Sequence, residues 1–143
     1  MAEFKINISD PTNGKTKQFV VNTDILIGKK IGENINGDLL GIEELKGYEL
    51  RITGGTDFAG FPMRPDIQGM SRKRILTGRS IGMRQQPEKG YRRRKTVVGN
   101  TISDKIVQVN TVIVKKGAID IFAPQEQEEK QQEQGKNSSE ASK

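Results

Sequence analysis

The 143-residue chain contains no cysteine, no histidine and no tryptophan. Because it has no cysteine, it can form neither a disulfide framework nor a thiolate metal site, and a reducing cytoplasm is permitted. The absence of histidine removes the commonest general base at neutral pH and the commonest neutral metal ligand. We therefore expect no catalytic residue, no metal, no cofactor and no small-molecule substrate.

Long hydrophobic runs are missing as well. Hydrophobic residues make up 32% of the chain, and no segment is long and apolar enough to span a membrane. The first ten residues, MAEFKINISD, lack the apolar stretch of a secretory signal. These observations predict a cytoplasmic location and no membrane partner.

The apolar residues that are present favour β-structure. Isoleucine and valine occur 16 and 8 times, against 6 leucines and 5 alanines. Side chains branched at Cβ fit a pleated sheet better than a helix. The 16 glycines indicate many tight turns. Alternating or continuous apolar residues predict strands over residues 3–9, 16–22, 48–53, 72–77, 94–103 and 106–114.

We expect these strands to form an all-β, mainly antiparallel domain over residues 1–123, either a small β-barrel or a sandwich. Residues 26–45 predict short helical turns and loop, because glycines interrupt every apolar pattern there. Residues 124–143 form an acidic tail rich in Gln and Glu, with Ala141 as its only hydrophobic residue. Such a segment cannot bury a core, so we expect it to be disordered or weakly helical.

The net charge of +6 is concentrated in one segment. Residues 61–95 carry eleven cations against two acidic residues, a net of +9, whereas residues 1–60 have a net of −2. Arginine outnumbers lysine there by 8 to 3, and its planar fork of donors matches phosphate oxygens. The alternative is a solvated basic face that only keeps the protein soluble.

Nucleic acid is favoured over lipid as the polyanion, because glycines and a proline break any amphipathic helix in this segment. The candidate RNA-binding residues are Arg64, Arg72, Lys73, Arg74, Arg79, Arg84, Lys89, Arg92, Arg93, Arg94 and Lys95.

The glycine-rich segment TGGTDFAGFPM invites comparison with a phosphate-binding loop, but it lacks the pattern G-x-x-x-x-G-K-[ST]. We interpret it as a turn in which Gly54 and Gly55 end a strand and open a loop. Phe58 and Phe61 could stack on nucleobases or plug the mouth of the barrel, and Phe61 is the better core candidate. Asp57 has no evident partner in the sequence and receives no acid–base role.

Three segments together resemble a known family. KGYELRITGGTDFAGFPM, GYRRRKTVVGNTIS and VNTVIVKKG follow one another in this order, with the basic stretch between the first two. Over about residues 3–118 the chain resembles the S6e family of small-subunit ribosomal proteins, which archaea and eukaryotes share. Several landmarks in one order make this resemblance more specific than any single motif.

The resemblance implies a β-barrel domain in the small (30S-type) ribosomal subunit, held by ribosomal RNA beside neighbouring ribosomal proteins, with no catalytic role. The run Arg92–Lys95 would then lie against RNA phosphates. Eukaryotic members continue into a long basic C-terminal helix that ends in phosphorylated serines. The tail here is short and acidic, so the chain resembles the archaeal form, and that phosphorylation is not carried over to Ser138, Ser139 or Ser142.

Two other functions stay open at this point. A stand-alone RNA-binding β-barrel, acting as a translation or ribosome-assembly factor, would use the same basic segment transiently. An enzyme acting on a polyanion is the weaker alternative, because the segment holds no paired carboxylates and no nucleophile–base set. Ser71 and Ser80 lie in it without the sequence setting of a catalytic serine.

Overall fold

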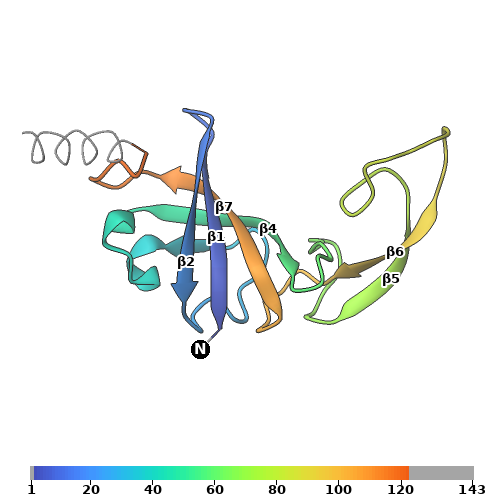
Figure 1. Cartoon of the computed structure of the whole chain (residues 1–143), viewed down its shortest axis with the longest axis horizontal. Coiled ribbons are helices and arrows are strands. Elements are labelled where there is room, and N and C mark those ends of the chain that lie inside the picture. Colours follow the sequence, from blue (N-terminus) through green and yellow to red (C-terminus); the bar gives the residue numbers. More distant parts are fainter. Residues whose placement is uncertain (1, 123–143) are drawn as a thin grey trace, which may run out of the picture.

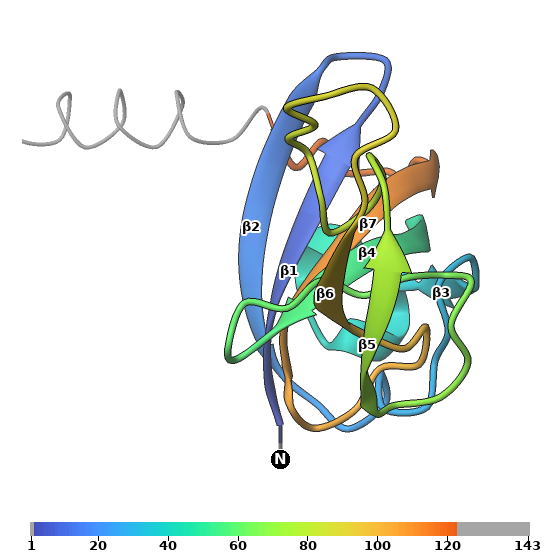
Figure 2. The ribbon, with the colours of Figure 1, turned by 90° about the vertical axis from the view of Figure 1, so that its right-hand side faces the viewer.

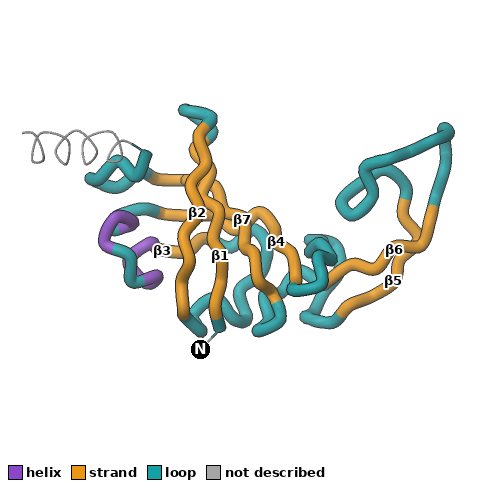
Figure 3. Tube along the Cα trace, in the orientation of Figure 1, coloured by secondary structure: helices purple, strands orange, loops and turns teal. Residues whose placement is uncertain are grey.

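The computed structural model describes residues 2–122, and within them seven strands form a five-stranded sheet and a separate two-stranded ribbon (Figure 1). Two short 3-10 helices complete the secondary structure (Figure 3). The larger sheet has the order β2-β1-β7-β4-β3, and the ribbon pairs β5 with β6. The elements are β1 Glu3–Asp10, β2 Lys15–Asn22, β3 Asn34–Asn36, η1 Gly37–Leu40, η2 Glu43–Leu45, β4 Glu49–Asp57, β5 Arg72–Thr77, β6 Arg93–Val98 and β7 Ile106–Lys115.

The all-β, mainly antiparallel class is confirmed, since only the β1–β7 pair is parallel among the described strands. The expected barrel was wrong. Within residues 2–122 the larger sheet stays open, with β2 and β3 as edges that do not pair with each other. The strands that could have extended the sheet toward closure, β5 and β6, instead pair with each other and project from its side (Figure 1).

One face of the larger sheet carries the hydrophobic core. In β1 the side chains of Phe4, Ile6 and Ile8 alternate with polar neighbours and are at most 1% exposed. Leu50 in β4 and Val109 in β7 extend the same buried layer. Burying one such side chain contributes about 1.5–3 kcal/mol. The period of two in the sequence therefore sets which face of the sheet is buried.

Most predicted strands overlap strands of the structure, with differences at their ends. The β1–β2 hairpin, the strand over 72–77 and the strand over 106–114 are confirmed, and the region 26–45 contains the short helical turns. The strand predicted over 94–103 ends at Val98, and the three-residue strand β3 was not predicted. The tail of residues 124–143 lies outside the described residues. No helix in the described part is long and apolar enough to cross a membrane.

The glycine pair Gly54 and Gly55 lies inside β4 and does not open a loop, so that interpretation was wrong. A Cβ on Gly55 would lie 2.4 Å from the backbone oxygen of Gln108 in β7. A Cβ on Gly54 would meet nothing within 4 Å. Gly55 is therefore required by the close approach of the neighbouring strand, where only a residue without a side chain fits.

The two glycines predict opposite outcomes for the same substitution. Gly55→Ala should lower the free energy of unfolding by about 1–3 kcal/mol, because the β4 and β7 backbones must move apart. Gly54→Ala is the matched control, and its stability should equal or exceed that of the wild type by up to about 1 kcal/mol. Denaturant unfolding of both variants measures this, and equal losses at both positions would contradict the packing explanation.

Candidate nucleic-acid interface

Residues 72–98, here called the arm, consist of β5, β6 and the loop 78–92 that joins them. The arm extends from the side of the larger sheet in Figure 1, and Figure 2 shows β5 and β6 in front of that sheet. Ten of the eleven candidate RNA-binding residues lie on the arm, against Glu88 as its one acidic residue, so its net charge is +9. The eleventh, Arg64, lies at the root of the arm.

The register of the ribbon keeps its cations apart. Consecutive side chains of a strand point to opposite faces, so like neighbours on one face are about 6.8 Å apart along the strand. Across the ribbon, every cation stands opposite an uncharged residue, which avoids the directly opposed like charges that destabilise a sheet. The pairs are Arg72–Val98, Lys73–Val97, Arg74–Thr96, Ile75–Lys95, Leu76–Arg94 and Thr77–Arg93.

Most of these cations face solvent. Nine of the ten on the arm are exposed, and Lys95 is half-buried. Within residues 2–122, none of Arg92, Arg93 and Arg94 forms an ion pair. The chain therefore leaves these three arginines available to an external anion.

The arm is attached to the larger sheet by an ion pair at its root. The Asp57 carboxylate, at the end of β4, is 2% exposed and accepts a hydrogen bond of 2.7 Å from Nε of Arg72, the first residue of β5. The Arg72 guanidinium also lies 4.8 Å from the ring centre of Phe58 and 5.0 Å from that of Phe61. Breaking a pair with one buried member is destabilising, because the remaining charge loses its partner.

Backbone hydrogen bonds attach β6 in the same way. The Val98 amide donates to the Pro62 carbonyl at 2.8 Å, and the Arg64 amide donates to the Val98 carbonyl at 3.0 Å. Val97 and Val98 are buried at 0% and 2% exposure. A two-stranded ribbon is at best marginally stable alone, so these contacts make the root of the arm part of the folded body.

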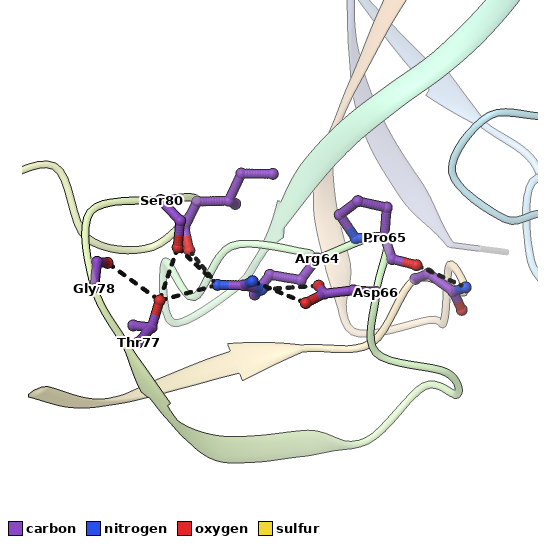
Figure 4. Close-up of polar contacts among 8 residues, drawn as sticks. Arg64, Pro65, Asp66, Thr77, Gly78 and Ser80 are labelled. Carbon is purple, nitrogen blue, oxygen red and sulfur yellow. Dashed lines mark hydrogen bonds and ion pairs between the residues drawn. The ribbon is translucent and has the colours of Figure 1, made fainter. Parts of the chain in front are cut away.

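The Arg64 side chain is used inside the protein (Figure 4). Its Nε and Nη2 donate to the two carboxylate oxygens of Asp66 at 2.9 and 2.8 Å. Its Nη1 donates to Thr77 Oγ1, Ser80 Oγ and the Ile81 carbonyl at 3.0–3.2 Å. All three nitrogens of the guanidinium have partners, and they join the chain that enters the arm to the start of its loop.

The ion pair between Arg64 and Asp66 shifts the pKa values of both groups in the direction that favours their charged forms. The hydrogen bond from Arg64 lowers the pKa of Asp66, and the same bond raises the pKa of Arg64, while desolvation opposes each shift. Asp66 follows Arg64 by two residues, which is the sequence signal that could have marked this arginine as internally paired. The long-range partners Thr77 and Ser80 gave no such signal.

Three cations of the arm line a hollow beside its loop. The hollow has a volume of about 260 Å³ and is lined by Arg84, Tyr91, Arg93 and Lys95 among others. Three cations and a phenol around one concavity can hold an anion such as a phosphate. Arg84 lies outside the strand that carries Arg93 and Lys95, so the sequence did not predict this grouping.

Within residues 2–122, no group of three or more acidic residues could hold a metal ion.

Comparison with protein families matches residues 4–125 to the family described as Ribosomal protein S6e. The chain belongs to the ribosomal protein S6e family. It is therefore a structural constituent of the ribosome and not an enzyme.

Three archaeal relatives illustrate the similarity. Each is named small ribosomal subunit protein eS6. The Archaeoglobus fulgidus protein is 47% identical over 131 residues, which is 87% of this chain and 99% of the relative. The Methanocaldococcus jannaschii protein is 46% identical over 82% of this chain and 86% of its own length. The Nanoarchaeum equitans protein is 51% identical over 79% of this chain and 82% of its own length.

These findings confirm the resemblance to archaeal members, and they do not favour the stand-alone factor as an alternative function. They also agree with an all-β ribosomal protein. The structure adds two contacts that the sequence did not reveal, the Asp57–Arg72 pair and the Arg64 network. It also confirms Phe61 as the core candidate, since Phe61 is partly buried against the core whereas Phe58 is exposed.

The Arg64 network predicts that lysine cannot replace this arginine. Arg64→Lys keeps the charge but cannot reproduce the planar fork, so we expect a loss of about 1–3 kcal/mol in the free energy of unfolding. Hydrogen exchange of the Met83 amide, which donates to the Ser80 carbonyl in the loop, should accelerate. Arg84→Lys, at an exposed position, is the control and should stay within about 0.5 kcal/mol of the wild type. Equal behaviour of the two variants would show that the network does not stabilise the loop.

Proposed function

We propose that this chain is a structural constituent of the small ribosomal subunit and that its arm binds ribosomal RNA, mainly through phosphates. Family membership supports the first statement, and the named relatives are small-subunit proteins. The observation that carries the second is the net charge of +9 on the arm. Its neighbours in the particle would be ribosomal RNA and other small-subunit proteins, within the cytoplasmic ribosome.

The geometry of the arm supports phosphate binding over base-specific readout as the main source of RNA affinity. Its cations project from both faces of a narrow ribbon, as the alternation in β5 and β6 requires. A ribbon that is cationic on both faces can contact phosphates of two RNA segments at once, which joins them without reading their sequence. The proposed contacts are Arg72, Lys73, Arg74, Arg79, Arg84, Lys89, Arg92, Arg93, Arg94 and Lys95.

Arg64 differs from the other ten candidates. Its guanidinium nitrogens all have partners within the protein, so contact between Arg64 and RNA stays a prediction. Its present geometry supports an indirect contribution, because it fixes the loop that carries Arg79 and Arg84.

The salt dependence of binding tests the proposed function. Affinity for a transcript of archaeal small-subunit ribosomal RNA should fall steeply with salt, because each neutralised phosphate releases counterions. Replacing Arg92, Arg93 and Arg94 with Gln should reduce the slope of log K against log salt by up to about 2.7, which is about 0.9 for each lost contact. The fold should be retained, since these side chains are exposed.

Two control variants sharpen this test. Changing Lys5, Lys15 and Lys46 to Gln removes the same charge from exposed positions outside the arm, and should leave the slope near that of the wild type. Changing Arg92, Arg93 and Arg94 to Lys should restore the slope and only part of the affinity, because the fork is lost. An equal effect of the two Gln variants would mean that total charge, and not the arm, binds the RNA.

A further inference from the structure

An exposed aromatic ring lies at the root of the arm. The Phe58 side chain is 66% exposed, while Phe4 and Tyr48 are buried at 0% and 4%. Tyr91, on the arm itself, is 38% exposed. One exposed apolar side chain is ordinary on a protein surface. What distinguishes Phe58 is that several hydrogen bonds fix the backbone turn that carries it.

The turn that carries Phe58 is fixed by hydrogen bonds. The Phe58 amide donates to the Lys105 carbonyl at 3.1 Å. The buried Asp57 carboxylate accepts from the amides of Ala59 and Phe61 at 3.0 and 2.9 Å. The next turn residue, Gly60, has φ of 89°, which favours glycine. The ring is therefore presented from a backbone that loses little freedom when a ligand binds.

A positioned arginine lies against the same ring. The Arg72 guanidinium is 4.8 Å from the centre of the Phe58 ring, and its Nε is held by Asp57. Within residues 2–122, its two terminal nitrogens make no hydrogen bond, so they remain able to donate to a ligand. Next to Arg72 lies a hollow of about 220 Å³, whose lining includes Ser71, Ser103 and Lys105. Hydroxyl and ammonium groups there can contact a sugar or a phosphate.

We propose that Phe58 and Arg72 form a stacking site for an unpaired nucleobase of RNA at the root of the arm. An aromatic ring and a guanidinium plane are the groups on which splayed-out RNA bases stack. The free donors of Arg72 and the adjacent hollow suit the attached sugar and phosphate. This site rests on the proposed function and adds to it, because a stacked base would supply a contact to the base itself, which phosphate contacts do not make.

The site is tested with the full chain and a transcript of archaeal small-subunit ribosomal RNA. Phe58→Ala should weaken binding about 5- to 150-fold, the range given by loss of one stacked base. The slope of log K against log salt should not change, because no phosphate contact is removed. Phe58→Trp should bind within about 3-fold of the wild type, since a larger ring preserves stacking.

Chemical probing locates the base. Dimethyl sulfate modification of the bound RNA should show one unpaired adenine or cytosine that the wild type and Phe58→Trp protect. The same base should be reactive when Phe58→Ala is bound. A base-specific carbodiimide gives the same test for uridine and guanosine. Leu39→Ala is the matched control, because Leu39 is 50% exposed in η1, away from the arm. It should change neither affinity nor protection. Thermal unfolding confirms that each variant is folded.

Three results would overturn the stacking site. In the first, Phe58→Ala binds and protects the RNA like the wild type, while the arm variants lose affinity. This result would refute the stacking site and leave the proposed function intact. Normal binding of Phe58→Ala to naked RNA with poor incorporation into subunits would show that a neighbouring protein covers Phe58. Failure of the wild type to bind the RNA at all would refute both proposals.

Discussion

The carboxylate of Asp57 is the group on which the position of the arm and of the turn beside it depends. It is 2% exposed, ends β4, holds the turn after that strand through two backbone amides and pairs with Arg72 at the start of β5. The larger sheet has a hydrophobic core of its own, but the ribbon does not. The direction of the arm is therefore fixed by contacts at its root, of which this is the ion pair with a buried carboxylate. The same contacts orient Phe58.

An arm with a net charge of +9 would be expected to repel itself. The arm itself has only Glu88 as a counter-charge, and Asp57 of β4 pairs with Arg72, so most of that repulsion is limited by geometry. In β5 and β6, alternation separates successive cations onto two faces, and the register places an uncharged residue opposite each of these six cations. The consecutive run Arg92–Lys95 is thus compatible with a folded structure before any RNA is present. The arm therefore carries a high density of cations, and their spacing limits repulsion in the free protein.

The sequence predicted features that depend on local pattern. The alternation of Phe4, Ile6 and Ile8 identified β1 and its buried face, because burial on one side of a strand has a period of two. The charge pattern identified the basic segment 61–95, and ten of its eleven cations lie on the arm. The family resemblance rested on ordered landmarks and was confirmed by the comparisons.

The features that sequence reasoning missed depend on pairings between distant segments. Gly55 is required by the backbone of Gln108, which is distant in the sequence. Its neighbours in the sequence alone were typical of a turn. Asp66 was a local signal of pairing for Arg64, but only the fold shows that Thr77 and Ser80 also accept hydrogen bonds from its guanidinium. The expected barrel was wrong because the sequences of β5 and β6 do not indicate that these strands pair with each other and not with the larger sheet. Pairing choice is a property of the assembled chain.

On the function proposed above, we infer that RNA binding by the arm would require its fixed attachment to the larger sheet and not its charge alone. Asp57→Asn separates these explanations, since it raises the formal net charge of the chain from +6 to +7 while weakening the attachment of Arg72. The decisive measurement is the affinity of this variant for archaeal small-subunit ribosomal RNA at moderate salt. We expect binding to weaken about tenfold or more, which corresponds to about 1.4 kcal/mol or more. Equal or tighter binding of Asp57→Asn would contradict this explanation and show that charge alone is sufficient.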